Sequence, residues 1–190
     1  MTVSQDQERS ELIPGSLPAD AYPDREQIST HWASLGYPSE AVARHWESRS
    51  CGALSLRMAY RLLLDHLIDP ASLTEELLAD GAYSERKGWL HAGLAAHARS
   101  TGLQAELVTF NDPGDFAGSL RSPGVCIASV GRSFDEPGTQ GHLILASGIT
   151  NNRQVRVHDP NGSSAPGGDK RVPLDVFWEH FSGRALYLRE

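Results

Sequence analysis

The sequence has few of the residues that build disulfide frameworks and metal sites. Only two of its 190 residues are cysteines, and they are not spaced as a C-x-x-C zinc or redox pair. No HExxH or similar metal-binding spacing occurs, so we expect neither a metal ion nor another cofactor. No apolar run approaches the ~18 residues that are needed to cross a bilayer, so we expect no membrane partner.

Positive charge is also scarce. Lys and Arg number 17 against 24 Asp and Glu, and the net charge is −7. No run rich in Lys or Arg occurs either, which argues against nucleic-acid binding. Residues 1–12 are polar and lack the apolar core of a signal peptide, so we expect a cytoplasmic location. No feature of the sequence indicates an oligomeric state.

The chain changes character along its length. Residues 1–23 are rich in proline and charge, which predicts a flexible N-terminal arm, whereas residues 24–190 suffice for a single domain. Helical spacing dominates the first half of this domain and strand-like alternation the second, which predicts an α+β fold with an antiparallel sheet. We expect helices at 51–64, 70–78, 88–98, 115–120 and 174–181, with one or two more in 24–43, strands at 103–110, 124–130, 143–148, 155–158 and 184–188, and loops at 131–141 and 161–169.

Cys51 lies where a polar run becomes apolar. Residues such as Leu54 and Met58 follow it at helical spacing, which predicts a helix that begins at Cys51 and is capped by Ser48 or Ser50. A cysteine in the first turn of a helix lies near unpaired N–H groups and the positive end of the helix dipole. Both favour the thiolate, which is the reactive form of cysteine.

Two interpretations of this cysteine remain open at this point. In the first, Cys51 is a nucleophile, and Gly52 leaves one side of its sulfur uncrowded. In the second, Cys51 is a small apolar core residue, as we expect for Cys126 in its strand-like run. The choice depends on whether a base lies nearby.

A second region supplies a candidate base. Turn-like residues at 150–153 separate two strand-like runs, which predicts a β-hairpin with His142 and Asp159 at its open end. A histidine held by a carboxylate is a general base with a fixed tautomer. The alternative is that His142 is an exposed strand-end residue and Asp159 a turn former before proline. His91 and His97 lie on a predicted helix, and we expect them to be solvated or capping.

Four segments, in their order and spacing, resemble the C39-like peptidases, a branch of the papain-like cysteine protease superfamily. These segments are 50–58, 88–94, 141–148 and 155–162. The resemblance extends over residues 45–188 and implies a papain-like fold with N-terminal helices packed on an antiparallel sheet. It also implies that Cys51 is the nucleophile, His142 the base and Asp159 its orienting partner.

The resemblance is incomplete at the oxyanion position. Such enzymes usually have a glutamine six residues before the cysteine, which helps to hold the oxyanion, and the residue here is His45. His45 can donate a hydrogen bond in its place, and so can Arg49 or Ser50; otherwise the oxyanion hole is weakened. Loss of one such donor typically costs about 10²–10³ in rate.

Three functions are compatible with these residues. The first is a cysteine peptidase that hydrolyses a peptide or small-peptide precursor through a thioester acyl-enzyme. The second is an acyl transferase or amidase, which shares the nucleophile but changes the acceptor or the amide. The third is a catalytically weak peptide-binding domain, favoured by the histidine at position 45. The partner in each case is a peptide or protein, and the negative net charge is compatible with basic substrates or with solubility alone.

Overall fold

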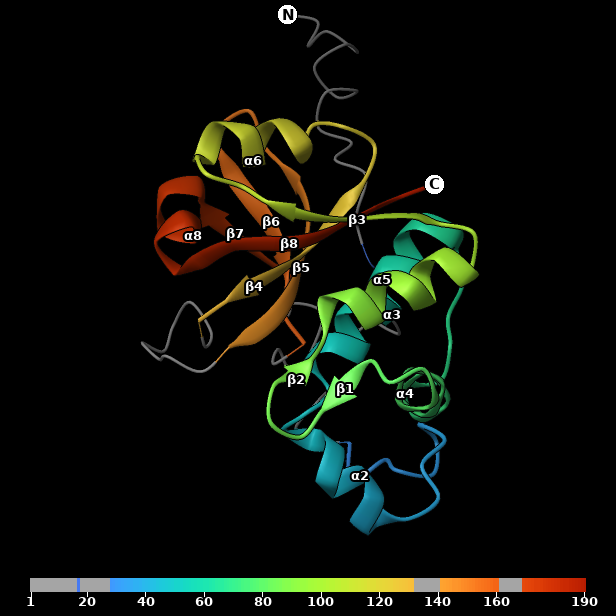
Figure 1. Cartoon of the computed structure of the whole chain (residues 1–190). Helices are drawn as coiled ribbons and strands as arrows, with labels where there is room; N and C mark the ends of the chain where they lie inside the picture. The colour runs from blue at the N-terminus through green and yellow to red at the C-terminus, as the bar shows by residue number, and fades with distance from the viewer. Residues whose placement is uncertain (1–16, 18–27, 132–140, 161–168) are drawn as a thin grey trace, which may run out of the picture.

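The structure of the chain is a computed structural model that describes residue 17 and residues 28–131, 141–160 and 169–190 (Figure 1). Most of the predicted arm and nearly all of the two predicted loops therefore lie outside the described residues. Leu17, within the segment predicted to be an arm, is 6% exposed and belongs to the apolar core.

Six antiparallel strands form the main sheet in the order β3-β8-β4-β5-β6-β7. Their bounds are Gln104–Thr109 (β3), Val125–Val130 (β4), His142–Ile149 (β5), Gln154–His158 (β6), Asp169–Pro173 (β7) and Phe181–Arg189 (β8). All five predicted strands are present. The edge strand β7 was not predicted, because its sequence is charged, ends in proline and buries only Val172.

The helices agree with the predictions except in two places. Their bounds are Glu40–Glu47 (α2), Cys51–Leu64 (α3), Pro70–Ala79 (α4), His91–Ser100 (α5), Pro113–Ser119 (α6) and Leu174–His180 (α8). Residues 28–36 form successive turns, where a helix was expected. The helix predicted from residue 88 begins only at His91, because Gly88–Trp89 forms a short strand, β2, paired with β1 at Tyr83–Ser84.

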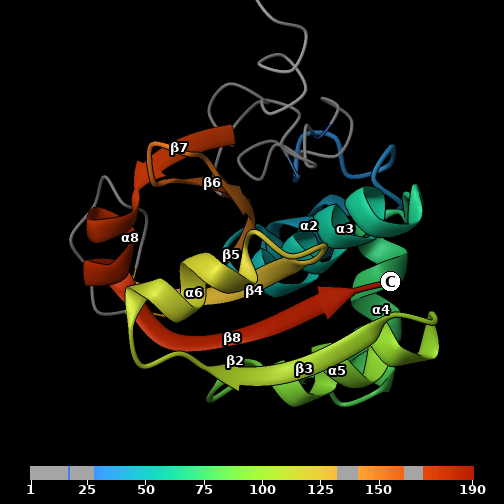
Figure 2. The same cartoon turned by 90° about the horizontal axis from the view of Figure 1, so that it is seen from above.

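The sheet separates two apolar cores. Helices α3, α4 and α5 pack on one face of the sheet, and α6 and α8 pack on the other (Figure 2). Alternate residues of β5 divide between these cores: Leu143 and Leu145 belong to the first, and Ile144 and Ala146 to the second. This is the predicted α+β arrangement, with the N-terminal helices packed on an antiparallel sheet.

The predicted hairpin is formed by β5 and β6. Thr150 and Arg153 close its turn with a backbone hydrogen bond of 2.9 Å. Leu145 pairs with His158, so Asp159 follows the last paired residue of β6 and approaches His142 diagonally. Diagonal neighbours in an antiparallel pair are still within reach of polar side chains.

Candidate active site

Cys51 is the first residue of α3, as predicted. Of the two predicted caps, Ser50 occupies the N-cap position but makes no side-chain capping bond, and Ser48 is the C-cap of α2. The apolar face that follows Cys51 is fully buried, including Leu54 and Met58. Burial of that face therefore fixes the start of the helix, and with it the position of the half-buried thiol.

Gly52 lies against Trp89. A Cβ atom at Gly52 would lie 2.3 Å from Cγ of the indole, closer than real side chains approach. The indole Nε1 donates a hydrogen bond of 2.5 Å to the carbonyl of Arg49. Gly52 therefore permits the β1–β2 hairpin to pack on the start of α3. We had expected this glycine to leave open space beside the Cys51 sulfur instead.

The structure brings His142, Asp159 and Cys51 together. Nε2 of His142 lies 2.8 Å from Oδ1 of Asp159, and both residues are buried. Because a carboxylate only accepts hydrogen bonds, Nε2 carries the proton and Nδ1 is left for the Cys51 thiol, the other side-chain partner of the ring. The hydrogen bond to the Asp159 carboxylate therefore fixes the tautomer of the His142 ring, which also interacts with the Cys51 thiol.

The environment of His142 favours its protonated form. Burial by itself lowers the pKa of His142. The hydrogen bond to Asp159 and the hydrogen bond and charge of Cys51 outweigh burial, and the pKa rises from the ordinary 6.5 to about 9. At neutral pH the ring therefore holds a proton readily. This is the behaviour expected of a base that takes the proton of a neighbouring thiol.

A hydrogen bond holds α3 against β5. Oγ of Ser55, one turn after Cys51, donates 3.1 Å to the carbonyl of Leu143, the residue after His142. Because both groups are buried, this bond fixes the start of α3 relative to the start of β5.

The three oxyanion candidates lie in different surroundings. His45 is exposed on α2 and packs its ring on Trp46 at a centroid distance of 5.1 Å; it does not line the pocket beside Cys51. Ser50 is fully buried and also does not line the pocket. Arg49 lines the pocket, and its Nη1 donates hydrogen bonds to the carbonyl oxygen of His45 at 3.0 Å and to Oγ of Ser48 at 3.3 Å. Of the three, the structure brings only Arg49 to the pocket.

A pocket of about 560 Å³ opens beside the thiol. It lies where α3, the β1–β2 hairpin, the start of α5 and the sheet meet. Its lining consists of Ser48, Arg49, Cys51, Tyr83, Lys87, Gly88, Trp89, Leu90, His91, Ser129, Gly141, His142, Leu143 and Arg184. Cys51 and His142 thus line one cavity.

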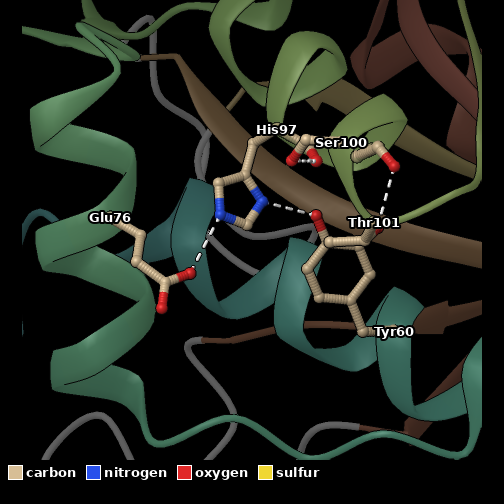
Figure 3. Close-up of polar contacts among 6 residues, drawn as sticks. Tyr60, Glu76, His97, Ser100 and Thr101 are labelled. Atoms are coloured by element: carbon tan, nitrogen blue, oxygen red, sulfur yellow. Dashed lines mark hydrogen bonds and ion pairs between the residues drawn. The ribbon is translucent and has the colours of Figure 1, made fainter.

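Two other histidines differ from the prediction. His91 is half-buried in the pocket wall, where burial and then the charge of Arg184 lower its pKa. His97 is buried, not solvated: its ring lies between the Tyr60 hydroxyl, 2.7 Å from Nδ1, and the Glu76 carboxylate, 3.1 Å from Nε2 (Figure 3). Neither position could be inferred from local spacing, because the neighbouring residues come from distant segments: Arg184 from β8 for His91, and Tyr60 and Glu76 from α3 and α4 for His97.

Cys126 is buried in β4, as expected for a structural cysteine, and burial raises the pKa of its thiol to about 12. Among the described residues, no three His, Cys, Asp or Glu side chains are grouped so that they could hold a metal ion. Within the same residues, no helix is long and apolar enough to span a membrane.

No protein-family model and no curated protein matches this sequence. Solved structures do match it. The peptidase domain of Streptococcus ComA, a bifunctional ABC transporter of a quorum-sensing pathway, is 17% identical with a TM-score of 0.57; the match covers 75% of this chain and 92% of that domain. A protein described as a C39-like peptidase from Bacillus anthracis is 18% identical with a TM-score of 0.56, covering 75% and 89% of the two chains.

A third structure contains a bound peptide. It is a double-glycine-motif protease of an AMS/PCAT transporter in complex with its leader peptide, 19% identical with a TM-score of 0.53 over 74% of this chain and 85% of that one. At these identities the similarity establishes the fold. The predicted resemblance to C39 peptidases and the α+β, papain-like fold are confirmed.

Proposed function

We propose that this protein is a cysteine peptidase in which Cys51 is the nucleophile, His142 the general base and acid, and Asp159 the orienting residue. The observation that carries this proposal is the buried His142–Asp159 hydrogen bond, with Cys51 as a second side-chain partner of the same ring. Cys51 and His142 line a pocket, and Asp159 is fully buried. The peptidase-like fold of the chain agrees with this chemistry.

The reaction uses each of the three residues. The Cys51 thiol gives its proton to Nδ1 of His142, and the sulfur bonds to the carbonyl carbon of the peptide. The C–N bond then breaks, and the proton on His142 passes to the leaving amine, which leaves a thioester. Water attacks the thioester while His142 takes its proton, and the C–S bond breaks to release the acid. Asp159 keeps the ring in position throughout.

Arg49 takes the part of the oxyanion donor in this proposal. It lies two residues before Cys51, lines the same pocket and carries a permanent charge. The backbone N–H groups at the start of α3 supply further donors, since the first N–H groups of a helix have no partner within it. An Arg49→Ala variant is expected to lose about 10²–10³ in kcat, whereas a His45→Ala variant is expected to keep its rate.

The substrate in this proposal is a peptide, since a structure of similar fold holds a leader peptide. The test is to incubate the protein with short peptides that contain a central Gly-Gly and to measure product masses. Hydrolysis adds one water across two fragments. Transfer to an added amine attaches that amine to the acyl fragment, and deamidation changes a side chain without cutting. Cleavage that survives in the Cys51→Ala variant would overturn the proposal.

Alkylation tests the same site without a substrate. Iodoacetamide is expected to modify Cys51 rapidly at neutral pH, and much more slowly in His142→Ala, because the proton acceptor is then missing. Cys126 provides the internal control, since burial raises its thiol pKa to about 12 and it should react slowly in both proteins. If Cys51 reacts as slowly as Cys126 in the native wild-type protein, a binding domain becomes the better interpretation.

A further inference from the structure

The charge of the pocket is opposite to that of the whole chain. The chain has a net charge of −7, yet the pocket is lined by Arg49, Lys87 and Arg184 and by no Asp or Glu among the described residues. Its remaining titratable lining consists of Cys51, Tyr83 and two histidines. Among the described residues, every Lys, Arg, Asp or Glu that lines the cavity is therefore basic, although the chain as a whole is negative.

The three cations reach the pocket from separate parts of the fold. Arg49 comes from the connection between α2 and α3, Lys87 from the turn of the β1–β2 hairpin, and Arg184 from β8. All three are exposed, and among the described residues none of them forms an ion pair with a carboxylate. Their charges are therefore available to a molecule that enters the pocket.

The field of these residues extends into the cavity. The charge of Arg184 is the second cause, after burial, of the lowered pKa of His91, which also lines the pocket. Clefts lined by one sign of charge concentrate oppositely charged ligands, because their low-dielectric walls focus the field. A carboxylate in the pocket would thus be attracted by several groups at once.

We propose that this pocket selects acidic peptide segments, with Lys87 and Arg184 binding carboxylates of the segment whose peptide bond meets Cys51. The inference rests on the proposed peptidase function and names its substrate class. It reverses the simplest interpretation of the net charge, which is compatible with basic substrates. The carboxylates are those of Asp and Glu side chains or of a peptide C-terminus.

The experiment uses peptides that share a central Gly-Gly and differ only in the flanking residues: Glu, Gln or Lys. Each peptide is made with a free and with an amidated C-terminus, which separates side-chain carboxylates from a terminal one. Cleavage is measured as kcat/KM with the wild-type protein, and binding as fluorescence anisotropy with the Cys51→Ala variant. We expect the Glu peptides to be preferred over the Gln peptides by about tenfold at low salt, with a smaller ratio at high salt.

Charge-reversed variants identify the residues responsible. Lys87→Glu and Arg184→Glu are each expected to lower the Glu-to-Gln preference several-fold, and the double variant to favour the Lys peptides. Arg86→Glu is the matched control, because Arg86 neighbours Lys87 in the same hairpin turn and does not line the pocket. Arg49 is kept unchanged, since its proposed role in the reaction would confuse the result.

The two readouts separate this inference from the proposed function. Selective binding of the Glu peptides without cleavage supports the inference that the pocket binds acidic peptides, and it contradicts the proposed peptidase function. Cleavage with equal kcat/KM for the Glu, Gln and Lys peptides supports the peptidase and overturns the inference. Equal binding of all peptides, or an equal loss of selectivity in Arg86→Glu, also overturns it, whether or not any peptide is cut.

Discussion

Two histidines of this protein are equally buried and each lies between a carboxylate and a side chain with a proton to donate, yet the two networks are open to solvent at opposite ends. His142 lies between a carboxylate, Asp159, and a thiol, Cys51; His97 lies between a carboxylate, Glu76, and the hydroxyl of Tyr60 (Figure 3). In both, Nε2 faces the carboxylate, and in His97 Nδ1 faces the hydroxyl of Tyr60.

The difference lies in which end of each network is open. In the first, Asp159 is fully buried and the half-buried Cys51 lines the pocket. In the second, Tyr60 is fully buried between helices, and the carboxylate of Glu76 is 56% exposed. Burial raises the pKa of Tyr60, so its hydroxyl stays neutral and no substrate can reach it. A carboxylate, a histidine and a nucleophile that are linked in space therefore suggest catalysis only where the nucleophile is the member that a substrate can reach.

The largest expected effect separates the two histidines by activity. His142→Ala is expected to lower kcat/KM for the best peptide by about 10²–10⁴-fold, because it removes the general base. His97→Ala is expected to leave kcat/KM near the wild-type value, since its network does not reach the pocket. Steady-state kinetics on folded, purified variants measures both, and an equal loss in the two variants would contradict the assignment.

The next effect separates them by stability. Tyr60→Phe removes one hydroxyl and leaves Nδ1 of His97 without its buried partner, which is expected to lower the free energy of unfolding by about 1–3 kcal/mol. This network joins α3, α4 and α5 through three side chains, so its loss loosens the first core. Urea unfolding measures the change. Glu76→Gln is the control with a smaller expected loss, because that carboxylate is mostly exposed.

A third prediction concerns pH. The pKa of His142 is raised from 6.5 to about 9, so the folded protein binds this proton more tightly than the unfolded chain. The stability that this provides is fully present below about pH 6.5 and is lost as pH rises through about 9. The difference in unfolding free energy between wild type and His142→Ala is therefore expected to shrink over that range, as measured by urea unfolding at several pH values. A difference that grows with pH would contradict the raised pKa.

The sequence predicts those parts of this site that depend on local patterns. The start of α3 follows from apolar spacing after Cys51, and the β5–β6 hairpin follows from two alternating runs around a turn. The missed strand β7 has a proline and only one buried residue, so no local pattern marks it. The true start of α5 was missed because Gly88 adopts φ +71° in the β1–β2 hairpin, which interrupts a helix-like run.

Features that combine distant segments were beyond the reach of such patterns. The positive pocket assembles Arg49, Lys87 and Arg184 from three elements, while the composition indicates only a negative chain. The contact of Gly52 with Trp89 joins α3 to strand β2, and the burial of His97 joins α5 to α3 and α4, so both likewise depend on segments that are distant in the sequence. Count and spacing of residue types contain no information about which exposed charges share a cavity.

The smallest expected effect tests how closely Cys51 and His142 are coupled. The hydrogen bond and the charge of Cys51 both raise the pKa of His142, so Cys51→Ala is expected to lower that pKa from about 9 while the Asp159 bond remains. NMR titration of the ring protons measures the shift. The His97 resonances serve as the control, because that ring contacts Tyr60 and Glu76 instead. An unchanged pKa for His142 in Cys51→Ala would mean that thiol and ring do not act as one pair, and the peptidase mechanism would lose its first step.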